Sequence, residues 1–201
     1  MWQIILAAGW PIWPLIIASV IALAIIGERA LALRESTVAP QNLLPEVQNW
    51  LTKGGITKEM ISKLEQHSPL GQIFASALAN TKNPRVVTKE AIEESGRAVA
   101  HNLEKYLSTL GTIATVAPLL GLLGTVIGMV ELFGAFTSTG HDIAQFARGI
   151  SVALYNTAAG IVVAVPAMIA YRYFRTKVDA LLIEMEQQAI KLVEIIHGER
   201  Q

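Results

Sequence analysis

The chain has 201 residues, of which 52% are hydrophobic and 16% charged, and its 16 basic side chains balance 16 acidic ones. Soluble domains average about 25% charged residues, so this composition favours a membrane protein. The neutral balance offers no basic field for nucleic acid, which is therefore excluded as a partner. The chain has no cysteine, which excludes disulfides, thiolate metal sites and a cysteine nucleophile.

Three stretches of the sequence carry no charged side chain and are long enough to cross a lipid bilayer. They are residues 1–27, 106–130 and 149–171, with lengths of 27, 25 and 23 residues. About 20 apolar residues suffice for one crossing. The sequence therefore predicts an all-α membrane protein with three transmembrane helices.

The basic residues predict the orientation of these helices. Ten Lys and Arg residues lie between the first and second stretches and five follow the third, whereas only Arg148 lies between the second and third. Basic residues stay on the cytoplasmic side of a membrane. We therefore expect the N-terminus outside, the C-terminus inside and a multi-pass location in a bacterial inner (cytoplasmic) membrane.

Residues 1–27 are predicted to form the first transmembrane helix, and residues 28–87 a cytoplasmic helical segment. We interpret the first helix as a retained anchor, because no basic residue precedes it and its apolar run is too long for a signal peptide. Within the cytoplasmic segment, Thr57 and the pair Ser68-Pro69 are typical starts of short helices.

The remaining chain is predicted to form two long helices joined by a short turn. Residues 88–135 are expected to be one helix that contains the second span, and residues 136–146 an outer turn. Residues 147–198 are expected to hold the third span and to continue as a cytoplasmic amphipathic helix. An apolar stripe runs along that continuation from Val178 to Ile196. Because no other predicted segment is large enough to cover the stripe, we expect partner copies of the chain to cover it.

The second span contains small and polar residues that a plain lipid anchor would avoid. At about 100° per residue, Gly121 and Gly128 lie near Thr125 on one side of the helix. Gly124 and Gly128 also have the spacing of a helix-contact motif. The predicted helix-packing residues are Pro118, Gly121, Gly124, Gly128 and, in the third span, Gly160.

The third span places polar groups in an otherwise apolar helix. An amide is costly in lipid without a partner, so Asn156 is expected to face other helices or water. Two helices that each carry hydroxyls among small residues favour a shared polar-lined interior over packing alone. The candidates for lining a pore or proton pathway are therefore Thr125, Ser151, Asn156 and Thr157.

The sequence offers no recognisable catalytic chemistry. The four histidines are scattered without ligand spacing, and neither a P-loop, a G-x-S-x-G motif nor a cluster of carboxylates is present. The glycine-rich run is not a phosphate-binding loop, because no strand precedes it and no lysine follows it. An enzyme is not expected, and no catalytic residue, metal or cofactor is predicted.

Two motifs give the chain a family resemblance. Residues 117–128, APLLGLLGTVIG, resemble the signature of the MotA/TolQ/ExbB proton-channel family. Residues 149–167, from Gly-Ile-Ser through Thr-Ala-Ala-Gly to Ala-Val-Pro-Ala, resemble the third membrane helix of that family. Among its branches, the short N-terminus and single apolar lead-in are most similar to ExbB, with TolQ close behind. MotA-like stators carry a further membrane helix, which disfavours a rotary stator.

The resemblance implies a homo-oligomer, a pentameric ring of this subunit in the lipid bilayer. It also implies single-span partners of the ExbD/TolR type, which bring the aspartate that takes and releases protons. Such a complex uses the proton gradient to drive TonB or, in the sister system, TolA. By position, Thr125 and Thr157 correspond to the pore-facing threonines of the family.

One residue departs from the family pattern. ExbB and TolQ proteins commonly carry glutamate where this chain has Val152. The departure favours an alternative in which the helices form a membrane scaffold that conducts nothing. If the outer turn is symmetric about Gly140, Glu131 lies at a similar depth and is a candidate to replace the missing carboxylate. An ion pair of Glu131 with Arg148, or exposure to interfacial water, is the favoured explanation for Glu131.

Overall fold

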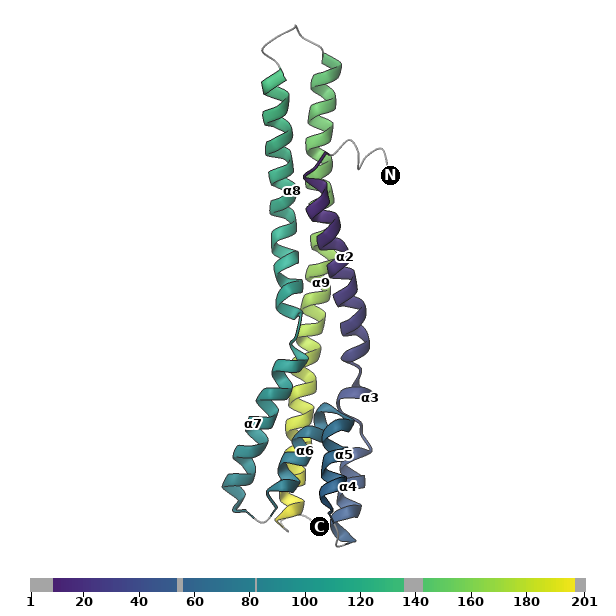
Figure 1. Ribbon diagram of the computed structural model, residues 1–201, viewed down its shortest axis with the longest axis vertical. Coiled ribbons are helices and arrows are strands. Elements are labelled where there is room, and N and C mark those ends of the chain that lie inside the picture. Colours follow the sequence, from purple (N-terminus) through teal and green to yellow (C-terminus); the bar gives the residue numbers. More distant parts are fainter. Residues whose placement is uncertain (1–8, 54–55, 82, 136–142, 198–201) are drawn as a thin grey trace. The chain divides into compact units, whose positions relative to one another are not determined.

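A computed structural model describes residues 9–53, 56–81, 83–135 and 143–197 (Figure 1). Every regular element of this described part is a helix, as predicted. The helices are α2 (Ile12–Ala32), α3 (Glu35–Val38), α4 (Leu43–Thr52), α5 (Lys58–His67), α6 (Pro69–Ala79), α7 (Arg85–Leu103), α8 (Leu107–Ala135) and α9 (Ile143–Ile196). The chain forms two compact units. The first unit comprises residues 1–28 and 106–173, and the second comprises residues 29–105 and 174–201.

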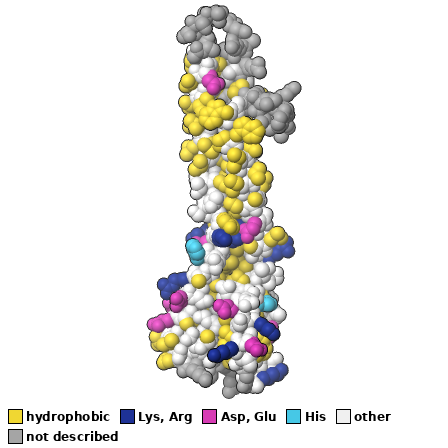
Figure 2. Space-filling view, in the orientation of Figure 1, with side chains coloured by type: hydrophobic (Ala, Val, Ile, Leu, Met, Phe, Trp, Pro, Cys, Tyr) yellow, Lys and Arg dark blue, Asp and Glu magenta, His cyan; other side chains and the backbone are white. Residues whose placement is uncertain are grey.

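Three helical stretches in the described part are long and apolar enough to cross a membrane, which confirms the predicted number of spans. They are Ile12–Ala32, Arg85–Phe133 and Gly149–Ile196. On the face drawn in Figure 2, hydrophobic side chains cover most of the first unit, whereas charged side chains gather on the second. This distribution is what a lipid-embedded unit and a water-exposed unit require.

In the second unit, two short helices start at the predicted residues. The Thr57 hydroxyl accepts a hydrogen bond from the Met60 amide at 3.4 Å, and the Ser68 hydroxyl accepts one from the Gly71 amide at 3.0 Å. Each hydroxyl thereby satisfies an amide that has no partner inside the helix. Pro69 occupies the first turn of α6, where its missing amide hydrogen costs nothing.

The predicted continuous helix over residues 88–135 is wrong. Residue 103 ends α7, residues 104–106 form a turn, and α8 begins at Leu107. Tyr106 has a φ of 64°, in the left-handed region that disfavours any residue with a Cβ. The buried Arg29 donates a hydrogen bond from Nη1 to the Leu103 carbonyl oxygen at 3.2 Å, which caps the end of α7. No proline or glycine marks this break in the sequence, and the apolar periodicity continues across it. The sequence therefore carries no sign that the helix ends there.

The expectation that partner copies cover the apolar stripe of α9 is also wrong. Its central side chains are 3% exposed or less within the single chain: Val178, Leu181, Met185, Ala189, Leu192 and Val193. They are buried in the second unit, to which the helices of residues 29–105 belong. An ion pair of 3.2 Å between Arg175 and Glu104 adds a polar contact at the start of this stretch. The short helices of the second unit thus form a larger core than their sequence predicted.

Candidate functional site in the α8–α9 helix pair

Glycine residues bring α8 and α9 of the first unit into backbone contact. A Cβ atom on Gly121 would lie 2.8 Å from the Asn156 carbonyl oxygen. A Cβ atom on Gly160 would lie 2.7 Å from the Ala117 carbonyl oxygen. Real side-chain carbons do not approach backbone oxygens so closely, so at these two positions only glycine permits the observed separation of the helices.

Asn156 fills the space that Gly124 leaves open. A Cβ atom on Gly124 would lie 2.6 Å from the Cβ and 2.7 Å from the Cγ of Asn156. The Asn156 side chain is 1% exposed, and its Nδ2 donates a hydrogen bond to the Val152 carbonyl oxygen at 3.4 Å. The Asn156 amide therefore lies in the contact between α8 and α9 and faces another helix, which was one of its two expected surroundings.

The contacts along the pair define an antiparallel register. Gly128 lies against Ala153, since a Cβ on the glycine would be 3.5 Å from the Ala153 Cβ. Near the end of α8 Gly149 lies against Leu132, and near its start a Cβ on Gly111 would lie 3.2 Å from the Tyr171 ring. Figure 1 shows the two helices side by side along this length. The register therefore fixes the depth of every residue of one helix against the other.

This register brings Thr125 and Thr157 together on one side of the pair. Each threonine immediately follows a contact residue, Gly124 in α8 and Asn156 in α9. A step of one residue turns about 100° around each axis, and in antiparallel helices the two turns lead to the same side. The two threonines also lie at similar depth, about 3 Å apart along the helix axes, because each is one residue beyond a contact and the helices run in opposite directions. Both are half-buried, and the Thr125 Oγ1 donates to the Leu122 carbonyl oxygen at 2.6 Å.

Glu131 and Val152 lie on the opposite side of the same helix pair. Each immediately precedes a contact residue, Leu132 in α8 and Ala153 in α9, so the turn leads away from the threonines. Continuing the register places Glu131 level with Ile150, two residues from Val152. The two positions therefore lie at similar depth, about 3 Å apart along the axes. Glu131 is exposed and Val152 half-buried. The side chain of Arg148 lies outside the described residues, as do residues 136–142 of the predicted turn.

Ser151 is not brought together with the other candidates. It is exposed, lies two residues from both Gly149 and Ala153, and so faces away from α8. Its hydroxyl donates to the Ala147 carbonyl oxygen of its own helix at 2.9 Å. Pro118 stands inside α8 next to the buried Ala117, and its side chain is half-buried. Within one chain the pair therefore presents two hydroxyls on one side and a carboxylate on the other.

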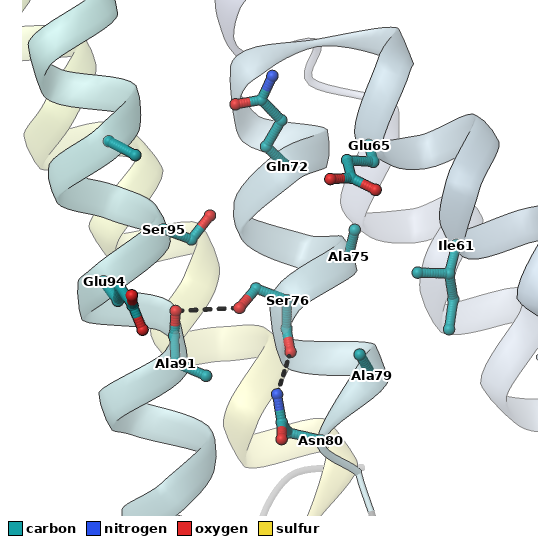
Figure 3. A pocket seen from close by; sticks show the side chains of 11 residues that line it. Ile61, Glu65, Gln72, Ala75, Ser76, Ala79, Asn80, Ala91, Glu94 and Ser95 are labelled. Carbon is teal, nitrogen blue, oxygen red and sulfur yellow. Dashed lines mark hydrogen bonds between the residues drawn. The ribbon is translucent and has the colours of Figure 1, made fainter.

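A groove in the second unit has a volume of about 540 Å³ and lies between α5, α6 and α7 (Figure 3). Across its floor the Ser76 hydroxyl donates to the Ala91 carbonyl oxygen at 3.0 Å. Its carboxylates, Glu65 and Glu94, come from different helices and are exposed. Among the described residues no group of three His, Asp or Glu side chains could hold a metal ion.

The fold and the α8–α9 contact define a helical multi-pass membrane protein. Residues 65–187 match the MotA/TolQ/ExbB proton channel family, and the chain belongs to this family. Members of the family are channels and not enzymes.

Similar proteins carry the names ExbB and TolQ. A putative biopolymer transport protein ExbB homolog of Methanothermobacter thermautotrophicus is 32% identical over 75% of this chain, and the match spans 54% of that relative's length. Biopolymer transport protein exbB1 of Vibrio cholerae is 28% identical over 89% of this chain and 80% of its own length. Tol-Pal system protein TolQ of Pseudomonas aeruginosa is 27% identical over 91% and 84%. The identities to the ExbB and TolQ relatives are nearly equal, so they do not assign the chain to either branch.

Sequence reasoning missed the specific pairing of Asn156 with Gly124. The glycine pattern indicated a smooth face on α8, and the polarity of Asn156 indicated a partner. Which glycine the amide would meet depends on the register of the two helices. The three-residue spacing of Gly121 and Gly124 matches that of Asn156 and Ala159, but small residues recur in both helices too often to select one register.

Proposed function

We propose that this chain is an inner-membrane proton-channel and motor subunit. With a single-span partner of the ExbD/TolR type, it uses the proton gradient to energise TonB-dependent transport across the outer membrane. The observation that carries the proposal is the placement of Thr125 and Thr157 at similar depth on one side of a glycine-packed helix pair. Membership of a proton-channel family supports it.

The two threonines supply hydrogen-bonding groups that can line a proton pathway. Hydroxyl groups both donate and accept hydrogen bonds, so they can orient water beside a carboxylate that takes up and releases protons. In this proposal the carboxylate is the partner's aspartate. A pentameric ring of the chain around the membrane helices of two partner subunits repeats the threonine pair five times at one depth. The proposal keeps the N-terminus outside and the C-terminus in the cytoplasm.

The glycine contacts provide the stiff wall that such a ring requires. Because Gly121 and Gly160 allow the backbones of α8 and α9 to touch, each subunit presents the pair as one unit. Apolar side chains such as Leu119, Leu122 and Val162 remain exposed on the pair. In the ring these faces meet lipid and neighbouring subunits.

A second candidate is a TolQ-like subunit that drives TolA in envelope maintenance. It is supported by the similarity to the Pseudomonas aeruginosa TolQ, which covers as much of this chain as the similarity to the Vibrio cholerae ExbB. A third candidate, a membrane scaffold that conducts nothing, is supported by Val152 at the position where the family commonly has glutamate.

Copurification and proton uptake together test the proposal. The full chain is co-expressed with single-span membrane proteins from the same organism, and the complex is purified. Native mass spectrometry of this complex should report five copies of the chain with a single-span partner. The same complex in liposomes with an imposed potential should acidify the lumen, as reported by a pH-sensitive dye. Liposomes with the chain alone are the control and should stay near the rate of empty liposomes. An assembled complex with the partner present but no proton uptake would favour the scaffold.

A further inference from the structure

Asn156 is the one buried polar side chain among the described residues of the first unit. The other buried polar side chains, Arg29, Ser68 and Thr88, belong to the second unit. The interface around Asn156 is made of glycine and alanine, at Gly121, Gly128, Ala153 and Gly160. Burying a carboxamide in such surroundings has a high desolvation cost. Favourable contacts of the Asn156 side chain must offset this cost.

The small residues of the interface do not select one register by themselves. If α9 moved by one helical turn towards the start of α8, Ala153 would lie against Gly124 and Gly149 against Gly128. Small residues would again meet small residues. Asn156 would then meet Gly121, where the α8 backbone now lies against the Gly160 backbone, since a Cβ on Gly121 would lie 3.3 Å from the Gly160 Cα. A carboxamide does not fit there without separating the helices, so Asn156 distinguishes two registers that glycine and alanine do not.

We propose that Asn156 is a positioning residue whose carboxamide, seated against Gly124, sets the register of α8 against α9. The register matters because Thr157 follows Asn156 directly and Thr125 follows Gly124 directly. Holding the amide against this glycine therefore keeps the two hydroxyls at similar depth on one side of the pair. This role deepens the proposed function and rests on it for the importance of the threonines, but the register itself is measurable without any transport.

Engineered disulfides measure the register, because the chain has no cysteine of its own. Gly128→Cys with Ala153→Cys reports the observed register, since the two Cβ atoms would lie about 3.5 Å apart, within the range of a disulfide. Gly128→Cys with Gly149→Cys reports the register one turn away. Both pairs are oxidised in native membranes containing the full chain. In the otherwise unchanged chain the first pair should cross-link and the second should not.

Removing the amide should change the ratio of these two cross-links. In the Asn156→Ala background we expect the ratio of the observed to the shifted cross-link to fall severalfold, because an alanine at this position fits both registers. Ser151→Ala is the matched control, because it removes a polar group from the side of α9 that faces away from α8, and it should leave the ratio unchanged. An unchanged ratio in Asn156→Ala would overturn the proposal.

An exchange of the two residues tests the contact rather than the side chain alone. Gly124→Asn with Asn156→Gly keeps the same two side chains and places the amide on the other helix. The exchange should restore the cross-link ratio towards that of the unchanged chain, while Gly124→Asn alone should lower it. If Asn156→Ala does not accumulate in membranes, the exchange decides the matter: restoration supports the proposal, and a ratio as low as in Gly124→Asn alone overturns it.

Proton uptake separates this proposal from the proposed function. If the cross-link ratio responds to Asn156 as expected and uptake falls in parallel, both stand. If the ratio responds but the complex with its partner moves no protons in any variant, the register role of Asn156 stands and the channel function fails. If the ratio does not respond while uptake is lost, the positioning role fails and Asn156 acts on transport by another route.

Discussion

Gly121 lies against Asn156 so closely that a single added methyl group would meet the Asn156 carbonyl oxygen at 2.8 Å. Backbone atoms cannot rotate away as a side chain can, so the two helices would have to separate. At Gly128, two turns along α8, an added Cβ would have the Ala153 Cβ as its nearest neighbour, at 3.5 Å, an ordinary contact. The glycines of one motif therefore differ in how much substitution they tolerate.

We expect Gly121→Ala to destabilise the first unit and Gly128→Ala to be tolerated. Overpacking of a close contact costs about 1–3 kcal/mol, whereas an ordinary contact gains or loses little. The thermal inactivation temperature of the purified complex in detergent should fall for Gly121→Ala and stay near that of the unchanged protein for Gly128→Ala. Equal effects of the two substitutions would contradict the observed closeness at Gly121.

The predicted orientation can be tested with single cysteines in the naturally cysteine-free chain. Ser138→Cys, in the predicted outer turn, should react with a membrane-impermeant maleimide from outside intact spheroplasts. Ser62→Cys, exposed on α5, should react only after the membrane is opened. The reverse labelling pattern would contradict the channel proposal, because it would place most of the lysine and arginine residues of the chain outside the cell.

The two hydroxyls at similar depth can be removed without loss of volume. Thr125→Val and Thr157→Val each delete one hydrogen-bonding group and keep the shape of the side chain. A hydrogen bond of about 0.5–1.5 kcal/mol corresponds to a two- to tenfold loss of proton uptake for each variant, with assembly unchanged. Thr112→Val is a matched control, because that hydroxyl is exposed and bonded to the Ser108 carbonyl oxygen of its own helix. Full activity of both pore variants would make the threonines packing residues.

The burial of the α9 stripe changes which substitutions probe assembly. Leu192 is 0% exposed within one chain, so Leu192→Asp should unfold the second unit rather than dissociate a ring. Ile183 and Ile190, on the exposed side of the same helix, are 57% and 50% exposed. We expect Ile183→Asp with Ile190→Asp to yield a folded chain of smaller oligomeric size, measured by size-exclusion chromatography with light scattering. Dissociation into a folded chain by Leu192→Asp would contradict the burial.

The sequence predicted the local features of the fold because they depend on neighbouring residues. The three apolar spans follow from composition, and the helix starts at Thr57 and Ser68 follow from capping chemistry. The break before α8 was not predicted, because a tyrosine in left-handed conformation and a capping arginine from residue 29 leave no local mark. The burial of the α9 stripe was missed for the same reason, since it depends on how four short helices pack. In the candidate site, the sequence indicated which polar residues to consider. The side of the α8–α9 pair on which each residue lies depends on the register of the two helices, which the sequence does not determine.

The last prediction concerns Glu131 and Val152, which lie at similar depth on one side of the α8–α9 pair. The sequence resemblance implies a glutamate in the family at the position of Val152, and the carboxylate of Glu131 lies close to that position, on the neighbouring helix. We therefore expect Glu131→Gln, which keeps the shape and removes the charge, to assemble normally and to lower proton uptake roughly tenfold or more, as for the loss of a charged hydrogen bond.

A second substitution tests whether the position or the helix matters. Val152→Glu in the Glu131→Gln background returns a carboxylate to a similar depth and the same side from α9, and it should restore much of the lost proton uptake. Ser151→Glu in that background is the matched control, because it places a carboxylate one residue away on the side of α9 that faces away from α8, and it should not restore uptake. Full activity of Glu131→Gln alone would end the idea, and Glu131 would then be a carboxylate that only meets interfacial water.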